Sequence, residues 1–140
     1  MPLVRIDVLR MEPSRLEAVG DAVQRGLTES IGFPPDDRFQ ILTNHDGATG
    51  TLRHGTYLEI PRDDGIVYID ITMRQGRTDE QKREMYAQVC RCVAEHARVA
   101  PHNIFIVVRE NHESDWSFGY GEAQYLQASS APARPGDPAQ

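Results

Sequence analysis

Residues 66–72 have the sequence IVYIDIT, and this stretch decides the fold class. Nearly every position is apolar and most of the side chains are β-branched. This composition is typical of a β-strand that is buried on both faces. We therefore expect a strand at the centre of a sheet.

The segment after this strand predicts a helix and then a second strand. Residues 78–81, TDEQ, form a capping box in which Thr78 and Gln81 each satisfy a backbone N–H of the first turn. Side chains at three- and four-residue steps continue one helical stripe to about Arg98: Met85, Val89, Val93 and His96. Residues 104–108 follow Pro101 and predict the second strand.

The first part of the chain repeats this order. Residues 3–9, LVRIDVL, alternate apolar and polar side chains as a half-buried strand does. Ser14 and Glu17 form a second capping box, which predicts a helix that Gly32 and Pro34 end near residue 31. Its apolar stripe is made by Leu16, Val19, Val23 and Leu27. Residues 39–43 predict the closing strand.

Two matching strand–helix–strand halves predict the fold class. Residues 5–8, RIDV, are echoed by residues 68–71, YIDI, which indicates a duplicated β-α-β unit. Right-handed crossovers place both helices on one face of a four-stranded mixed sheet, an α/β (α+β) sandwich of two layers. The loop-rich middle of the chain leaves room for one short strand at residues 57–60.

Length and composition indicate one domain. The chain has 140 residues, of which 39% are hydrophobic, enough for one continuous core. We assign the domain to residues 1–127, because residues 128–140 are almost entirely small or polar and are expected to form a disordered tail.

Charge and hydropathy exclude two classes of partner. The net charge of −6 is mixed along the chain, with no basic stripe of the kind that binds nucleic acid. No apolar run approaches the roughly 20 residues that cross a bilayer, and the N-terminus lacks a signal-peptide layout. We therefore expect a cytoplasmic protein without membrane contact.

The cysteines and histidines predict no metal site. Cys90 and Cys92 are two residues apart on a predicted helix, so their side chains diverge and do not bridge each other. The five histidines show neither zinc spacing nor a nucleophile partner: His45, His54, His96, His102 and His112. We assign them to surface or core positions and expect no metal and no cofactor.

Three sequence features resemble one enzyme family. The chain opens with Met1 and Pro2 directly before a strand, residues 115–126 are DWSFGYGEAQYL, and residues 34–40 are PPDDRFQ. Together with the duplicated unit, these features resemble the malonate semialdehyde decarboxylase branch of the tautomerase superfamily. The resemblance covers about residues 2–126, and the WSFG segment is specific to that branch.

The resemblance implies a homotrimer with one active site per subunit and no cofactor. In that family the catalytic residue is an N-terminal proline, which is Pro2 here once Met1 is removed. The implied companions are one aspartate and two arginines: Asp37, Arg74 and Arg77. The implied apolar wall of the substrate site is Trp116, Phe118 and Tyr125. The arginines depart from the family pattern, because two residues rather than one separate them.

The chemistry of these residues fits a small carbonyl acid as substrate. A neutral prolyl amine acts as a base in keto–enol tautomerisation, whereas a cationic one polarises a carbonyl. Asp37 favours the cation and can activate water for hydration, and an arginine can hold a substrate carboxylate and stabilise an enolate. Decarboxylation of a 3-oxo acid needs the same groups.

Each of these residues also has a non-catalytic interpretation. Asp37 suits a turn after Pro34 and Pro35, Arg77 suits an exposed position before Thr78, and the aromatic residues suit a core or a trimer interface. At the level of the whole protein, the alternative is a trimeric, cytokine-like binding protein in which the activity of Pro2 is vestigial.

Overall fold

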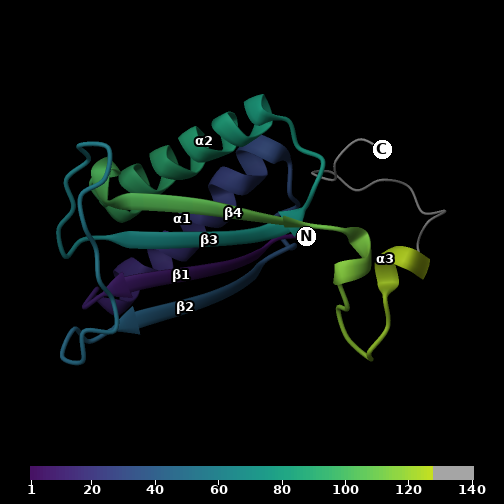
Figure 1. The fold of residues 1–140 in the computed structure, drawn as a ribbon, viewed down its shortest axis with the longest axis horizontal. Coiled ribbons are helices and arrows are strands. Elements are labelled where there is room, and N and C mark those ends of the chain that lie inside the picture. The colour runs from purple at the N-terminus through teal and green to yellow at the C-terminus, as the bar shows by residue number, and fades with distance from the viewer. Residues whose placement is uncertain (128–140) are drawn as a thin grey trace.

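The computed structural model describes residues 1–127 and contains one four-stranded sheet (Figure 1). The strands are β1 (Leu3–Leu9), β2 (Phe39–His45), β3 (Val67–Arg74) and β4 (Ile104–Asn111), in the order β2-β1-β3-β4. The pairs β1–β2 and β3–β4 are parallel, and β1 pairs with β3 antiparallel. The mixed four-stranded sheet predicted from the sequence is confirmed. The predicted tail, residues 128–140, lies outside the described residues.

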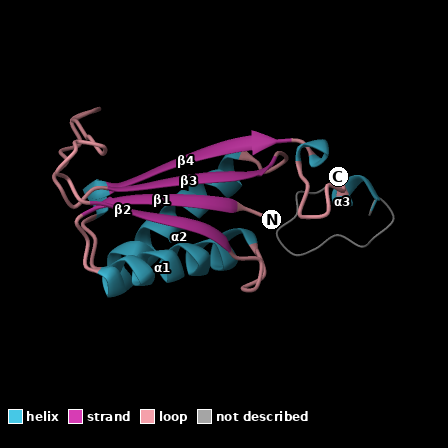
Figure 2. Ribbon diagram, turned by 90° about the horizontal axis from the view of Figure 1, so that it is seen from below, coloured by secondary structure: helices cyan, strands magenta, loops and turns pink. Residues whose placement is uncertain are grey.

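Two long helices cover one face of the sheet (Figure 2). Helix α1 (Pro13–Ile31) connects β1 to β2, and α2 (Asp79–Ala97) connects β3 to β4. The two β-α-β halves and the placement of both helices on one side are confirmed. The core lies between these layers, with Ile6, Ile69 and Val93 completely shielded from solvent.

Helix α1 begins earlier than the sequence predicted. Its N-cap is Glu12, whose side chain accepts a hydrogen bond from the backbone N–H of Arg15, and Pro13 opens the helix. The capping box assigned to Ser14 and Glu17 is wrong. Proline holds the residue before it in an extended conformation and is itself well suited to the first helical position, so the cap moves to Glu12. Gly32, with φ of 74°, ends the helix as expected.

Helix α2 starts at the predicted capping box, with both reciprocal hydrogen bonds of Thr78 and Gln81 present. Its buried stripe differs at one position, because His96 is exposed and Ala97 is buried in its place. Cys92 is also buried and Cys90 is half-buried, and both are free thiols. Neither long helix, nor any other helix within residues 1–127, has the apolar length that a bilayer-spanning segment requires.

The central strand β3 is buried on one face rather than on both. Val67, Ile69 and Ile71 are fully buried against the helices, whereas Tyr68 and Asp70 on the opposite face are only half-buried. The prediction of two covered faces is wrong because both helices lie on the same side. We call the uncovered side the open face of the sheet.

The loop between β2 and β3 contains no additional strand. Residues 57–60 form a tight turn with one isolated bridge between Tyr57 and Ile60, and Leu58 and Glu59 at its tip have positive φ. The short strand considered for this segment is therefore wrong. Strand β2, in contrast, runs two residues further than predicted, to His45.

The chain leaves β4 at the end of the sheet where the N-terminus lies (Figure 1). The two turns η1 (Pro101–Asn103) and η2 (Glu113–Asp115) flank β4, and the short helix α3 (Gln124–Gln127) follows η2. We call residues 112–127 the C-terminal arm. Because the arm projects past the strand ends, it can close over groups placed there.

Candidate active site

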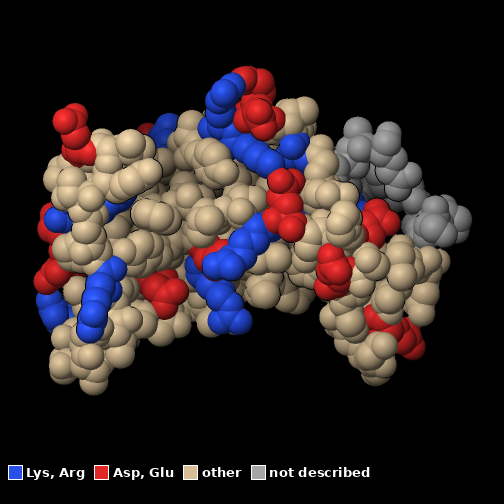
Figure 3. Space-filling view, in the orientation of Figure 1, with Lys and Arg blue, Asp and Glu red and all other residues tan. Residues whose placement is uncertain are grey.

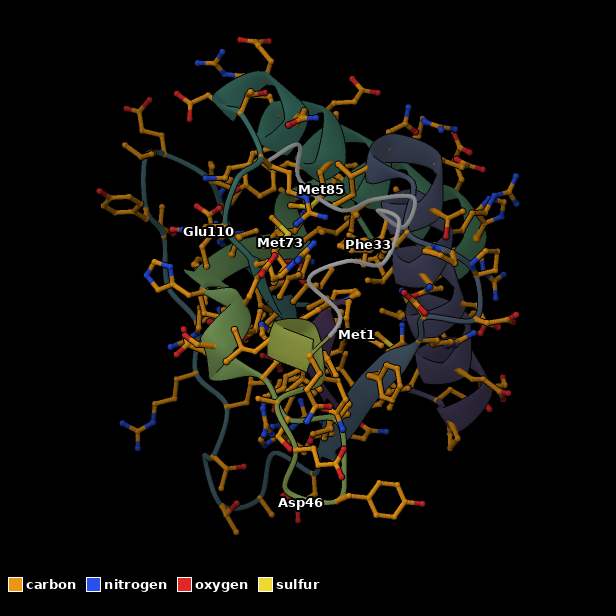
Figure 4. The ribbon with its side chains drawn as sticks, turned by 90° about the vertical axis from the view of Figure 1, so that its right-hand side faces the viewer. Met1, Phe33, Asp46, Met73, Met85 and Glu110 are labelled. Atoms are coloured by element: carbon orange, nitrogen blue, oxygen red, sulfur yellow. The ribbon has the colours of Figure 1, made fainter. Side chains whose placement is uncertain are left out.

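Four chain segments meet at one end of the sheet. Strands β1 and β2 begin there, and β3 and β4 end there, since Leu3 pairs with both Phe39 and Thr72, and Arg74 pairs with Asn111. Figure 4 is viewed from this end, with Met1 near the middle of the view. The topology therefore gathers the N-terminus, the residues before β2, and the residues after β3 and β4.

Pro2 is buried at the start of β1. In the structure it follows Met1, so its nitrogen is part of an amide, and the N-terminal ammonium belongs to Met1. That ammonium lies 3.5 Å from the hydroxyl oxygen of Tyr125. The N-terminal amine and the arm thus meet, although 124 residues separate them in the chain.

The three predicted wall aromatics form one continuous cluster in the arm. Trp116 stacks on Phe118 with ring centroids 5.6 Å apart, and Phe118 meets Tyr125 edge to face at 5.0 Å. The indole N–H of Trp116 donates to the Asn111 side chain at 2.7 Å, which ties the cluster to the end of β4. The three side chains thus lie together, and their role as the wall of a substrate site stays a prediction.

Arg74 is the last residue of β3 and extends this cluster. Its side chain is only 10% exposed, and its guanidinium lies over the Tyr125 ring at 4.5 Å. One guanidinium nitrogen, Nη1, is 2.5 Å from Oε1 of Glu113. Glu113 was not among the predicted site residues, because nothing in its local sequence distinguishes it from a solvated carboxylate.

Arg77 lies at the same end of the sheet. Its Nη1 donates to the backbone carbonyl of Arg74 at 3.0 Å, and its guanidinium covers the Phe33 ring at 4.9 Å. The residue is 7% exposed, so the solvent-exposed interpretation is wrong. The turn between β3 and α2 folds back, and this brings the two arginines together in spite of their unusual spacing.

Asp37 occupies the turn that leads into β2. Its backbone N–H donates to the carbonyl of Pro34 at 3.0 Å, and its own carbonyl accepts from the buried side chain of Gln24 at 3.3 Å. The turn interpretation is therefore correct. Asp37 also precedes Phe39 by two residues, as Met1 precedes Leu3 in the paired strand, so it lies at the end of the sheet where Pro2 lies.

A cavity of about 700 Å³ opens beside the arginines. Its lining combines both arginines with two carboxylates, Glu110 and Glu113. Pro2, Asp37 and the three aromatics do not line it. Of the predicted residues, Arg74 and Arg77 thus lie together at this cavity. Arg74 also contacts Tyr125, and through Tyr125 it is linked to the other aromatics and to the N-terminus.

A second cavity, of about 360 Å³, lies on the open face. His45 in its wall uses both ring nitrogens, one 2.7 Å from the Asp7 carboxylate and one 2.8 Å from the Thr51 hydroxyl. Tyr68 donates to the backbone carbonyl of Arg53 at 2.6 Å. These bonds fasten the loop after β2 to the sheet, which accounts for His45 as a structural residue.

Basic and acidic side chains are interspersed on the face shown in Figure 3, and no patch of one sign covers it. Within residues 1–127, no three metal-ligating side chains come together. The groups gathered at the strand ends are instead a terminal amine, two guanidinium groups, carboxylates and an aromatic cluster. Such a set can bind an organic anion and transfer protons.

Comparison with known proteins agrees with this assessment. A family model described as "Tautomerase enzyme" matches residues 37–119. A relative named "Probable tautomerase YusQ", from Bacillus subtilis (strain 168), is 32% identical over 129 residues, which are 91% of this chain and all of that protein. A second B. subtilis relative, "Probable tautomerase YrdN", is 29% identical over 90% of this chain and 97% of that protein.

Solved structures match over a similar length. FG41 malonate semialdehyde decarboxylase, inhibited by 3-bromopropiolate, is 36% identical with a TM-score of 0.83 over 94% of this chain and 99% of that one. A symmetric trimer of fused 4-OT, at 17% identity and a TM-score of 0.72, covers 89% of this chain and 98% of that one. The second likeness shows the fold alone.

Proposed function

The chain belongs to the tautomerase family, and from this premise we propose that it is a cofactor-free acid–base enzyme acting on a small 2-oxo or 3-oxo acid. Removal of Met1 makes Pro2 the N-terminal residue and its nitrogen a secondary amine. The 36% identity to a malonate semialdehyde decarboxylase along nearly the whole chain favours a 3-oxo monoacid and a lyase activity, decarboxylation or hydration, over simple tautomerisation.

One observation carries the proposal. The ammonium of Met1, the residue directly before Pro2, lies 3.5 Å from the Tyr125 hydroxyl, and the Tyr125 ring is covered by the guanidinium of Arg74 at 4.5 Å. The start of the chain and an anion-binding group therefore both contact one aromatic side chain, which supports Pro2 as the proton-transferring group near Arg74 once Met1 is removed.

The groups support decarboxylation as follows. Arg74 or Arg77 holds the substrate carboxyl group, and cationic Pro2 donates a hydrogen bond to the carbonyl oxygen. When the bond to the carboxylate carbon breaks, its electron pair moves toward the carbonyl and forms an enolate, and CO2 leaves. Pro2 then protonates the enolate and regains its proton from water. Trp116, Phe118 and Tyr125 keep water from the departing group.

Asp37 and a neutral Pro2 give the two related reactions. The Asp37 carboxylate can orient a water molecule for addition to an activated double or triple bond, which is hydration. With a neutral amine, Pro2 removes a proton from the carbon next to the carbonyl and returns it elsewhere, which is tautomerisation. The protonation state of Pro2 selects among these reactions.

We propose that the active form is a homotrimer. The open face of the sheet carries exposed apolar side chains from both edge strands: Phe39, Ile41, Phe105 and Val107. A related fold is found as a symmetric trimer in fused 4-OT. Covering this face with other subunits would bury these side chains, each of which is 40–50% exposed in one chain.

The test is the activity of Pro2→Ala toward 3-oxopropanoate, with mass spectrometry to verify that Met1 is absent from both proteins. The variant keeps an N-terminal amine but loses the rigid secondary amine, and we expect kcat/KM to fall by about 100-fold or more. A variant within twofold of the wild type would disprove the proposal. No turnover by the wild type of any small oxo acid would favour the binding-protein alternative.

Titration of the Pro2 nitrogen by NMR separates the reactions. A pKa below about 7 means a free base at neutral pH and favours tautomerisation, whereas a pKa well above about 7 means a cationic acid and favours decarboxylation or hydration.

A further inference from the structure

Glu113 forms an ion pair with Arg74 beside the 700 Å³ cavity. Its Oε1 lies 2.5 Å from Nη1 of Arg74, whose side chain is 10% exposed while that of Glu113 is 43% exposed. A hydrogen bond between two ionised groups is stronger than one between neutral groups. Glu113 therefore occupies one edge of the guanidinium on which the proposed function relies.

Local hydrogen bonds hold Glu113 in this place. The backbone N–H of His112 donates to the Asp115 carboxylate at 2.8 Å and closes the turn η2 around Glu113. The Gln75 side chain lies 3.0 Å from the ring of His112, and the Gln75 N–H donates to the Asn111 carbonyl at 2.8 Å. These contacts join η2 to the turn after Arg74, so Glu113 and Arg74 are fixed relative to each other.

The two carboxylates that line the 700 Å³ cavity have different cationic partners. Both Glu110 and Glu113 line the cavity together with Arg74 and Arg77. Glu110, however, pairs with Lys82 at 2.5 Å, a residue outside the lining, whereas Glu113 pairs with Arg74 itself. Glu113 thus holds one guanidinium nitrogen of Arg74 and adds its negative charge to the same cavity wall.

From this arrangement we propose that Glu113 is a specificity-determining residue that restricts the site to monocarboxylates. A dicarboxylate must either displace Glu113 from Arg74 or place a second negative charge beside it, and both cost binding free energy. A monocarboxylate brings one negative charge fewer to the neighbourhood of Glu113 and therefore meets a smaller penalty. This inference rests on the proposed function and adds to it the number of carboxylates that the substrate carries.

The kinetic test compares 3-oxopropanoate, with one carboxylate, and 2-oxobutanedioate, with two, in Glu113→Gln. Glutamine keeps the size of the side chain and an oxygen that accepts from Arg74, but it removes the negative charge. We expect the ratio of kcat/KM for the diacid to that for the monoacid to rise about tenfold or more over the wild-type ratio. Glu110→Gln is the matched control, since it removes the same charge from the same cavity wall without touching Arg74.

A binding measurement separates failure of this inference from failure of the proposed function. Butanedioate and propanoate do not react, and their dissociation constants can be measured by NMR titration of both variants and the wild type. We expect Glu113→Gln to lower the dissociation constant of butanedioate relative to that of propanoate by about the same factor as in the kinetic test. Glu110→Gln should leave this ratio unchanged. This shift without any turnover would support the role of Glu113 while rejecting the enzyme.

Two results would overturn the inference. Equal shifts in the two variants would mean that only the overall charge of the cavity matters. Wild-type preference for butanedioate over propanoate would mean that Glu113 excludes nothing. Thermal unfolding of each variant verifies that the comparison is made between folded proteins.

Discussion

Asp63 and Asn103 join the loop before β3 to the turn before β4 by two reciprocal hydrogen bonds. The side-chain amide nitrogen of Asn103 donates to the Asp63 carboxylate at 2.7 Å, and the backbone N–H of Asp63 donates to the side-chain oxygen of Asn103 at 3.2 Å. The backbone N–H of Gly65 also donates to Asp63, at 2.8 Å. The hydrogen bond from Gly65, followed by that from Asn103, holds the pKa of Asp63 below its ordinary value.

This depressed pKa predicts an acid-dependent stability. Because the folded state favours the ionised carboxylate, its contribution is fully present above the unfolded-state pKa and is lost as the pH falls through the lower folded-state pKa. Asp63→Asn removes the titrating group. We expect urea unfolding between about pH 5 and pH 2 to show a smaller loss of stability in Asp63→Asn than in the wild type. Parallel curves would contradict the assignment.

Arg74 and Arg77 are also held in place, at the candidate site, by partners from other parts of the chain. Both side chains are nearly buried, and each has aromatic and oxygen partners supplied by a different element: Tyr125 and Glu113 for Arg74, and Phe33 for Arg77. A guanidinium is stabilised at low exposure by such partners. The position of each charge is therefore decided by residues distant in the sequence.

At the scale of elements, helices α1 and α2 approach each other closely at Gly26. A methyl group added to Gly26 would lie 2.7 Å from the Cα of Val89, which is closer than carbon atoms pack. Glycine here serves close packing rather than an unusual backbone conformation. Six residues earlier, α1 has a second buried glycine, Gly20, whose neighbours are instead the side-chain ends of Gln40 and Leu42.

This difference predicts unequal effects on stability for two similar substitutions. Gly26→Ala pushes backbone against backbone, and we expect it to lower the free energy of unfolding by about 1–3 kcal/mol. Gly20→Ala meets only movable side-chain atoms and gains helix propensity, so its stability should stay within about 1 kcal/mol of the wild type. Chemical denaturation measures both. Equal effects would mean that the two helices can separate without cost.

At the scale of the whole molecule, the two faces of the sheet differ. One face is covered by α1 and α2, and the open face carries half-exposed apolar residues from β2 and β4, including Ile41 and Val107. The charged side chains between them include one ion pair, Asp70 with Arg109 at 3.0 Å. A surface of paired charges and apolar side chains suits contact with other subunits.

The proposed trimer can be tested on this surface. Val107→Glu places a charge on the open face without disturbing the core, because Val107 is 40% exposed in one chain. We expect this variant to shift the mass measured by light scattering toward the monomer, since burying an unpaired carboxylate disfavours association. Ala87→Glu, on the exposed side of α2, is the control and should keep the wild-type mass. A trimer in both variants would place the interface elsewhere.

Local patterns in the sequence determined the elements and their order. Hydrophobic periodicity and the capping box at Thr78 depend on residues at most four positions apart, and they predicted both β-α-β halves, the mixed sheet and the single helical layer correctly. The resemblance of the DWSFGYGEAQYL segment to one enzyme branch added the family. Local rules failed at Glu12, where proline moved the cap, and at β3, where only the common placement of the helices leaves one face open.

Contacts between distant residues were decided by the tertiary structure alone. The N-terminal amine meets Tyr125 across 124 residues, and Arg74 meets Glu113 across 39. Such pairs depend on strand register and on where each loop returns, which no local periodicity encodes. For this reason the sequence predicted the residue types of the candidate site but missed Glu113, and only the structure shows Arg77 buried beside Arg74.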